Sequence, residues 1–402
     1  MLTSTHHVDC IVVGAGPAGL AAAHELMRVG RRVVVLERGG SVASSWRTHR
    51  PGLRLHTVRR LSGLPGLAIP RRYGRYVSSQ NLVTYLEEYA AGIDVRFGVD
   101  VAKITRADAT GPVSAWVVDT DAGTRYVTDT VVMATGYNRR PFVPQLPGID
   151  GYRGALLHVA DYRGGGEFAG RDVLVVGSGN AASEAAAELV STGVRRVCMS
   201  VRTTPHIVRR RIAGVSMQAI AILLDRVPTR LADHVASVLS RLTVPDLSGR
   251  ALPRPSPDLY TRVARDRSVP VHDTGIVALV QSGAVAPVAA VAGFDGDSVL
   301  LADGSVATPD VVLFATGYRR ALEKLLAGLG LLDAGGSPLS RSGTAAAPGF
   351  YFVGFTVSAT GALRQMAGDA RRVARAETGR ARQPRVHTAA VSGVRAGTVS
   401  RA

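Results

Sequence analysis

The sequence predicts an α/β protein made of two Rossmann-like dinucleotide-binding domains, one inserted into the other, in the three-layer ββα/αβα arrangement. Three observations predict this class. Glycine-rich turns follow apolar strands at residues 12–19 and again at residues 175–182. Each turn opens a helix of small residues, and another apolar strand comes after that helix. The tetrapeptide Ala-Thr-Gly-Tyr ends a strand twice, at 134–137 and 315–318, which indicates that one nucleotide-binding unit is repeated.

The first unit, residues 8–37, carries the pattern Gly-x-Gly-x-x-Gly in its turn. Gly14 permits a tight turn, Gly16 lets the backbone approach a pyrophosphate, and Gly19 lets the helix pack closely on the strand. The start of that helix offers free N–H groups to the phosphates. The next strand ends at Glu37, whose carboxylate suits a free ribose 2′-hydroxyl. We therefore expect the first unit to bind FAD.

The second unit, residues 171–202, repeats the strand, turn, helix and strand. Gly177 and Gly179 occupy the first two glycine positions, and Ala182 stands at the third, where the pattern also allows alanine. The second strand leads to Arg202, whose planar and permanently charged guanidinium suits a 2′-phosphate. We therefore expect this unit to bind NADPH, and the pair of units predicts a flavin enzyme that NADPH reduces.

The remaining segments follow from local patterns. Between the units we expect a long loop at residues 38–60 and a helix at 81–91. Several short strands follow at 93–133, and a Pro-rich segment at 138–147 crosses between the domains. After the second unit we expect an amphipathic helical stretch at residues 215–242, broken by Pro228, and then a Pro-rich loop at 243–258. Strands are expected at 306–318 and 350–355, and a final helix from residue 362 onward.

These segments give a predicted domain division. The FAD domain is discontinuous, at residues 1–155 and 317–376, and the NADPH domain, at residues 156–316, is inserted into it. Residues 377–402 are predicted to form a disordered, Arg-rich tail. The helical stretch 215–242 has three open interpretations: a pair of domain-packing helices, a lid over a substrate tunnel, or a surface that associates weakly with a membrane.

The formal net charge of +17 would suit a nucleic-acid-binding protein. However, aromatic residues make up only 5% of the chain and do not alternate with basic residues, which argues against a nucleic-acid platform. Eight arginines and one glutamate lie in residues 371–402, so part of the charge is concentrated at one end. A surface rich in arginine, or one that attracts anionic substrates or NADPH, explains the remaining charge.

Other features exclude further classes. No positively charged segment precedes an apolar run at the N-terminus, and no apolar run reaches the ~20 residues of a membrane span, so we expect a cytoplasmic protein. The two cysteines, Cys10 and Cys198, lie in apolar strands and form no Cys-x-x-Cys pair, which excludes a dithiol redox couple. No His/Cys cluster has the spacing of metal ligands, so we expect no metal site.

The segment between the glycine loops reads Tyr152-x-Gly154-x-x-x-His158-x-x-x-Tyr162. It resembles the fingerprint of the flavin-containing monooxygenases, with Tyr152 in place of a phenylalanine. Other runs are similar to the YUCCA-type indole-3-pyruvate monooxygenases and their bacterial relatives, and the similarity extends from about Val8 to Val373. These runs are Val35–Arg38, Ala43–Trp46, Arg54–His56, His158–Tyr162, Val175–Asn180 and Gly354–Thr356.

This resemblance implies a sequence of steps. NADPH reduces FAD, and the reduced flavin reacts with O₂ to give a C4a-(hydro)peroxyflavin while NADP⁺ stays bound and shields it from water. The acceptor is a small organic molecule: either a 2-oxo acid such as indole-3-pyruvate, which loses CO₂, or a soft nitrogen or sulfur centre. Because the flavin performs the oxygen chemistry, the protein needs no nucleophile and base of its own.

Particular residues are candidates for each role. For FAD they are Gly14, Gly16, Gly19, Glu37, Arg38, Trp46, Thr135 and Gly136. For NADPH they are Gly177, Ser178, Gly179, Asn180, Arg202, Thr203, Thr316 and Gly317. Larger members of the family carry a flavin-proximal Asn, and the resemblance puts His56 at or near that position. Ser79 is a second catalytic candidate, although a polar residue there also suits a helix cap.

Two other functions stay open on the sequence. The first is an FAD-dependent reductase that passes electrons from NADPH to ferredoxin or a quinone, which would share both glycine loops but gives no reason for the fingerprint between them. The second is a non-catalytic nucleotide-sensing or basic binding protein that uses the Arg-rich tail.

Overall fold

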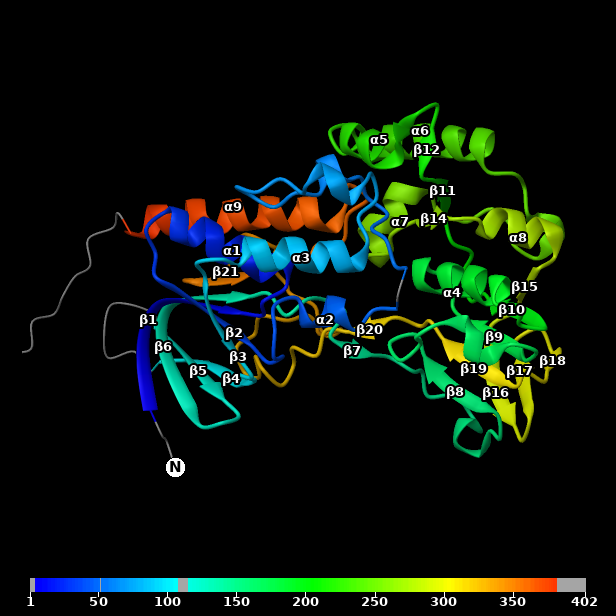
Figure 1. The fold of residues 1–402 in the computed structure, drawn as a ribbon, viewed down its shortest axis with the longest axis horizontal. Coiled ribbons are helices and arrows are strands. Elements are labelled where there is room, and N and C mark those ends of the chain that lie inside the picture. Colours follow the sequence, from blue (N-terminus) through cyan, green and yellow to red (C-terminus); the bar gives the residue numbers. More distant parts are fainter. Residues whose placement is uncertain (1–3, 51, 108–114, 382–402) are drawn as a thin grey trace, which may run out of the picture.

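The computed structural model describes residues 4–50, 52–107 and 115–381. Two α/β parts lie side by side along the long axis of the molecule (Figure 1), and each is built on a largely parallel sheet. The predicted fold class, two Rossmann-like units with helices packed on their sheets, is confirmed.

The first sheet has the strand order β21-β22-β6-β1-β2-β3, with β4 and β5 continuing from β6. Strands β22, β6, β1, β2 and β3 run parallel, so their carboxyl ends meet at one edge. The strands are β1 (Ser4–Val13), β2 (Val33–Glu37), β3 (Asp94–Phe97), β4 (Val101–Arg106), β5 (Trp116–Thr120), β6 (Thr124–Met133), β21 (Ala345–Ala347) and β22 (Phe350–Phe352).

Two layers cover this sheet. On one face lie α1 (Pro17–Arg28), α3 (Ser79–Tyr89) and α9 (Ala362–Ala381), as Figure 1 shows. On the other face the antiparallel strands β4 and β5 enclose a second core around Trp116, which is fully buried and donates its indole N–H to the carbonyl of Pro348 at 3.0 Å. Helix, sheet and sheet together give the predicted three layers.

The second sheet is wholly parallel, in the order β15-β10-β9-β19-β8. Its strands are β8 (Ala155–His158), β9 (Asp172–Val176), β10 (Arg196–Ser200), β15 (Val285–Val288) and β19 (Val311–Phe314). Helices α4 (Asn180–Ser191) and α8 (Ile276–Ser282) cover one face, and a small antiparallel sheet covers the other. That small sheet consists of β16 (Val291–Asp295), β17 (Ser298–Leu301) and β18 (Val306–Ala307).

The chain crosses between the two parts at adjacent points. The crossing strands β7 (Arg140–Pro141) and β20 (Tyr318–Arg319) pair antiparallel, with Tyr318 opposite Pro141. Because Ala155 begins β8 of the second sheet, we propose the predicted division of domains with this one residue moved to the NADPH domain.

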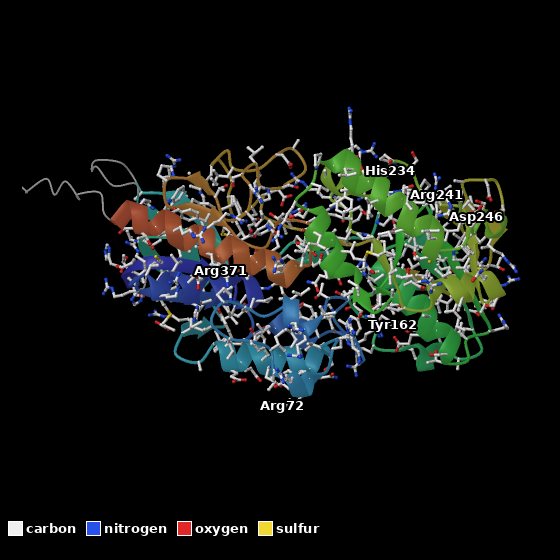
Figure 2. The ribbon with its side chains drawn as sticks, turned by 90° about the horizontal axis from the view of Figure 1, so that it is seen from above. Arg72, Tyr162, His234, Arg241, Asp246 and Arg371 are labelled. Atoms are coloured by element: carbon white, nitrogen blue, oxygen red, sulfur yellow. The ribbon has the colours of Figure 1, made fainter. Side chains whose placement is uncertain are left out.

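A helical insertion leaves the second part after β10 and forms an outer edge of the molecule (Figures 1 and 2). The predicted amphipathic stretch is helical and divides at Pro228, which is the N-cap of α6. Its elements are β11 (Ile207–Arg209), β12 (Arg211–Ile212), β13 (Val215–Ser216), α5 (Met217–Leu224), α6 (Thr229–Thr243), α7 (Leu259–Asp266) and β14 (Val271–Asp273).

The predicted start of the tail is wrong by five residues, because α9 continues through Ala381. The physical reason is Glu377, which is 1% exposed and accepts hydrogen bonds from Thr130 Oγ1 at 2.8 Å and Tyr351 Oη at 2.9 Å. These bonds fix the last turns of α9 to the first sheet. The rest of the predicted tail, residues 382–402, lies outside the described residues.

Candidate functional site

The first glycine loop connects β1 to α1 at the centre of the first sheet. Gly14 has φ +109°, and a Cβ there would lie 2.7 Å from the Ala134 carbonyl oxygen. A Cβ on Gly19 would lie 1.8 Å from the Gly14 carbonyl oxygen. By contrast, a Cβ on Gly16 would meet no atom within 4 Å. Gly14 and Gly19 therefore hold the loop together, and the open side at Gly16 is where a phosphate can approach the start of α1.

Glu37 ends β2 beside this loop and is 9% exposed. Its carboxylate accepts the backbone N–H of Ala15 and that of Gly39, both at 2.8 Å. One lone pair on each oxygen is thereby used, and the others stay free for a ribose diol. Arg38 follows and is exposed to solvent.

Two buried polar atoms near this loop have no hydrogen-bond partner among the described residues. Thr135, which follows β6, has its Oγ1 buried with no hydrogen-bond partner in the part of the chain that the structure describes, and so does the Nη1 atom of Arg139. Burial and the nearby Arg38 lower the pKa of Arg139. Buried polar groups in proteins are normally paired, so these atoms fit a site that a polar ligand completes. Gly136 has φ +76°.

The second glycine loop repeats this construction between β9 and α4. Gly177 has φ +128°, and a Cβ there would lie 2.6 Å from the Ala315 carbonyl oxygen, whereas Gly179 again has open space. A cavity of about 60 Å³ opens at this loop, with Ser178, Gly179 and Arg262 in its lining. A helix start with open space fits a second pyrophosphate.

The residues that follow β10 are available to a ligand. Ser178 donates its hydroxyl to the carbonyl of Thr203 at 3.0 Å, which ties the segment after β10 to the glycine loop. Arg202 is exposed and has no ion-pair partner among the described residues. Its cation therefore lies free beside the second loop, where the 2′-phosphate of NADPH is expected.

Asn180 has a structural role in the protein as it stands. Its Nδ2 donates to the Pro270 carbonyl at 3.0 Å, and its Oδ1 accepts the backbone N–H of His272 at 2.8 Å. The amide thus holds the start of β14 against the second glycine loop.

The fingerprint segment contains β8 and is hydrogen-bonded to the chain just before the second crossing strand, β20. The Nδ1 of His158 accepts the backbone N–H of Ala160 at 3.1 Å, so in the neutral ring Nε2 carries the proton and donates it to the Gly317 carbonyl at 3.1 Å. Burial lowers the pKa of His158. Tyr152 donates its hydroxyl to the Pro309 carbonyl at 2.5 Å. The fingerprint therefore fixes the second Ala-Thr-Gly-Tyr tetrapeptide in place.

The other predicted residues near the crossing also make structural contacts. Thr316 donates its hydroxyl to the Phe142 carbonyl, and Gly317 accepts the Phe142 N–H at 3.0 Å. Trp46 is half-buried against the first core, with its ring edge-on to His49 at a centroid distance of 5.4 Å.

A cluster of charged and aromatic side chains joins the two domains. Arg50 forms ion pairs with Glu184 at 2.9 Å and Glu188 at 2.7 Å, both on α4. The ring of His56 stacks on that of His272, with a centroid distance of 5.0 Å.

Burial dominates the ionisation of the two rings. It lowers the pKa of His56 to about 4, helped by Arg210 and Arg50, and it lowers the pKa of His272 to about 3. Both rings are therefore neutral near pH 7. His272 Nδ1 lacks a hydrogen-bond partner within the described ranges, and so does the Arg210 Nε atom.

The two catalytic candidates lie at different places. His56 faces the second domain, with its Nε2 3.4 Å from Glu184 and its Nδ1 3.5 Å from Arg210. Ser79 lies in the first turn of α3 and is 4% exposed, and Ser78 is the residue that caps this helix, accepting the N–H of Asn81 at 3.2 Å.

Gln218 is a residue that the sequence analysis missed. It is 4% exposed on α5, its Oε1 accepts the Val58 N–H at 2.8 Å, and its Nε2 donates to the Thr360 carbonyl at 2.9 Å. One side chain of the inserted domain thus holds two loops of the first domain. The available signal was a single amide in the otherwise apolar run of residues 217–224.

Two glycine loops on two parallel sheets, joined at adjacent crossings, define an oxidoreductase that binds two dinucleotides. The family model for pyridine nucleotide-disulphide oxidoreductases matches residues 11–230. Two relatives from rice are the indole-3-pyruvate monooxygenases YUCCA1 of Oryza sativa subsp. japonica, 36% identical, and YUCCA8 of Oryza sativa subsp. indica, 34% identical. Each match covers 86% of this chain and 86% of the relative.

The chain belongs to the pyridine nucleotide-disulphide oxidoreductase family and, within it, to the flavin-dependent monooxygenases of the YUCCA type. It is an enzyme that uses FAD and NADPH.

Solved structures agree with this fold. A flavin-containing monooxygenase from Stenotrophomonas maltophilia is similar at a TM-score of 0.70 with 23% identity, covering 94% of this chain and 99% of that one. The bacillithiol disulfide reductase of Bacillus cereus is similar at a TM-score of 0.66 with 19% identity, covering 93% and 100%. A reductase and a monooxygenase therefore share this architecture.

Within the described ranges, no group of three or more His, Cys, Asp or Glu side chains is placed to hold a metal ion. None of the described helices has the length and apolar character that crossing a bilayer requires.

Proposed function

We propose that the protein is an NADPH- and O₂-dependent monooxygenase that acts on a small 2-oxo acid, of which indole-3-pyruvate is an example. The observation that carries the proposal is the 36% identity to an enzyme named for indole-3-pyruvate, over 86% of both chains. Oxygen transfer to a soft nitrogen or sulfur centre is the competing outcome of the experiment below.

The first domain would hold FAD, which when bound accepts a hydride from NADPH and then reacts with O₂. The start of α1 at Gly16 binds the pyrophosphate, and Glu37 binds the ribose diol with the lone pairs that Ala15 and Gly39 leave free. The hydroxyl of Thr135, which has no hydrogen-bond partner among the described residues, would be available to the bound cofactor.

The second domain would hold NADPH. Gly179 gives the pyrophosphate access to the start of α4, and the exposed Arg202 binds the 2′-phosphate, which separates NADPH from NADH. Arg50 and Gln218 keep the two domains closed on one another, which excludes water from the space between the nucleotides.

The proposed reaction balances as follows. NADPH, one proton, O₂ and the 2-oxo acid give NADP⁺, water, CO₂ and a carboxylic acid one carbon shorter. The bond between the two carbonyl carbons breaks, one oxygen atom of O₂ forms the new carboxylate, and the other leaves as water. NADPH supplies the two electrons that this second oxygen atom requires.

The experiment is turnover in ¹⁸O₂. Phenylpyruvate and indole-3-pyruvate are each supplied with NADPH, and NADPH, O₂, CO₂ and the labelled product are measured together. We expect one ¹⁸O atom in each new acid and equal amounts of NADPH, O₂ and CO₂. Oxygenation of an amine or thioether without turnover of the oxo acids would reject the substrate class, and H₂O₂ as the sole oxygen product from every compound would reject the oxygenase assignment.

The shared architecture with bacillithiol disulfide reductase favours one alternative, electron transfer to another acceptor. Rapid mixing of the NADPH-reduced protein with O₂ separates the two. A transient spectrum before the oxidised flavin returns supports oxygenation, whereas fast reduction of ferredoxin or a quinone and slow reaction with O₂ would support the reductase.

A further inference from the structure

A cavity of about 360 Å³ lies between the helical insertion and the first domain. Helices α6 and α7 form one wall, and the loops at residues 338–342 and 355–359 form the other. No residue of either glycine loop lines it, so it lies away from the expected pyrophosphate positions. Since the enzyme needs a third site for its organic substrate, this cavity between two domains is the natural candidate.

The first-domain wall of the cavity leads directly to the FAD side. Its loop begins after Gly354, where a Cβ would lie 2.8 Å from Ala18 in the first turn of α1. The same loop continues to Thr360, whose carbonyl accepts the Gln218 amide, and then to the start of α9. A molecule in the cavity therefore rests on the segment that runs from β22 past the start of α1 to α9.

Three charged side chains line the cavity: Arg267, Arg341 and Asp225. Arg341 has no carboxylate within ion-pair distance in the described part of the chain, and Arg267 lies 3.8 Å from Asp333 in a pair that is open to solvent. The two cations outnumber the one lining carboxylate, which favours an anionic ligand.

The backbone of Arg267 supplies an independent observation. This residue ends α7 with φ +50°, a left-handed conformation that glycine or asparagine adopts more easily. Among the described residues other than glycine, four alanines share this conformation with Arg267, which is the one with a charged side chain and lines the cavity. Because strained backbone clusters at functional sites, Arg267 is a candidate ligand-binding residue.

We propose that this cavity binds an organic carboxylate that bears an apolar or aromatic group. Arg341 and Arg267 hold the carboxylate, and the wall formed by Tyr260, Val263, Phe355 and Val357 takes the apolar group. The proposal deepens the function proposed above, because a 2-oxo acid is such a molecule, and it assigns the residues that select for the acid.

The test uses two ligands of the same shape and different charge, 3-phenylpropanoate and 3-phenylpropanamide. Neither has a 2-oxo group, so the enzyme does not need to turn them over. Binding to the FAD-loaded full chain is measured by calorimetry for wild type, Arg341→Gln and Arg267→Gly. We expect each substitution to raise the Kd for the acid at least tenfold and to change the Kd for the amide by less than twofold.

Three control variants sharpen this result. Arg265→Gln removes a cation from the same helix that pairs with Asp266 outside the cavity, and it should change neither affinity. Ala264→Trp fills the cavity and should abolish binding of both ligands. Asp225→Asn removes the opposing negative charge and should lower the Kd for the acid.

Folding and function separate within this set. Because glycine relieves the φ of +50°, Arg267→Gly should melt at or above the wild-type temperature while it loses the acid. Equal loss of acid binding in Arg265→Gln, or unchanged binding of both ligands in Ala264→Trp, would overturn the proposal.

The outcome is also distinguishable from failure of the proposed function. If the enzyme oxygenates no oxo acid but the charge-selective binding is found, the carboxylate site in the cavity is supported and the proposed reaction is rejected. If oxo acids are oxygenated while Arg341→Gln and Arg267→Gly leave their KM unchanged, the reaction stands and this cavity is rejected as its substrate site.

Discussion

Gly16 and Gly19 stand three residues apart and should respond to alanine in opposite ways. Alanine at Gly16 meets open space, so we expect an unchanged melting temperature and a loss of FAD of tenfold or more, because the methyl group occupies the phosphate approach. Alanine at Gly19 drives a methyl group into the Gly14 carbonyl and should destabilise the fold by about 1–3 kcal/mol. Flavin absorbance per protein and thermal unfolding measure both effects. Similar melting temperatures for the two variants would contradict this.

Arg202 tests the choice of reductant. Arg202→Ala should raise the Kd for NADPH in anaerobic flavin reduction by roughly 10- to 100-fold, since a charge-assisted contact to phosphate is lost. NADH has no 2′-phosphate and should be unaffected. Arg196→Ala, which removes an exposed arginine at the other end of β10, is the matched control. An equal loss for both nucleotides would reject the role.

The stacked histidines make stability depend on pH. Burial keeps the folded pKa of His56 at about 4 and of His272 at about 3, below the ordinary value of 6.5, so the unfolded chain binds more protons. Stability is therefore complete above pH 6.5 and falls as the pH drops toward these values, by about 1.4 kcal/mol per pH unit for each ring.

Urea unfolding at pH 7, 6 and 5 measures this slope. We expect His272→Asn to reduce the slope by one proton, whatever its effect at pH 7. His234→Asn, on the outer edge of α6 in Figure 2, should leave the slope as in wild type. The same slope in all three proteins would show that the rings do not carry the effect.

The residues that the sequence predicts and those that it does not differ in the range of their contacts. Gly14, Gly19 and Glu37 act within one βαβ unit, so a local pattern is enough to find them. Gln218 and the pair of Arg50 with Glu184 join segments more than 130 positions apart in the chain, and only the folded chain brings them together.

At the scale of elements, α6 presents an apolar stripe to solvent. Leu231, Val238 and Leu242 are 51%, 43% and 78% exposed and recur at helical spacing. Arg230, His234 and Arg241 recur at helical spacing beside them, and Figure 2 labels His234 and Arg241 on α6. An exposed apolar stripe beside basic residues suits the surface of an anionic bilayer.

Vesicle sedimentation tests this element. We expect the protein to sediment with vesicles that contain phosphatidylglycerol and not with those of phosphatidylcholine alone. The double variant Leu231→Asp, Leu242→Asp should stay in the supernatant with unchanged FAD. Sedimentation that this variant retains would exclude α6 as the membrane surface.

Sequence patterns predict the ends of helices less well than their starts, as α9 shows. The periodicity predicted α9 from residue 362, as observed, but its end was placed before Glu377, because the many arginines of residues 371–402 suggested a solvated tail. The buried bonds of Glu377 to β6 and β22 determine the true end, and they are tertiary contacts.

At the scale of the whole molecule, these contacts decide where the chain can be shortened. We predict that a chain that ends at Ala381, which lacks only the remainder of the predicted Arg-rich tail, melts within about 2 °C of wild type and keeps its activity. A chain that ends at Ala376 loses Glu377 and should melt markedly lower. Equal melting temperatures, or lost flavin reduction in the longer chain, would contradict this account.

The overall architecture was predictable because the motifs of one nucleotide-binding unit occur twice in the sequence. Two glycine loops and two Ala-Thr-Gly-Tyr endings give the two sheets and their order in the chain. The relation of one domain to the other was not predictable, because it rests on side chains such as His158 and Arg50 that bond across the boundary.

The adjacent crossing strands have a consequence for how such an enzyme can be altered. Since β7 and β20 pair side by side, the inserted domain enters and leaves the host at one place, as a cassette does. A cassette of this kind can be exchanged without cutting the host sheet. The nucleotide specificity carried by the second glycine loop could thus be changed while the strand order of the first sheet stays as it is.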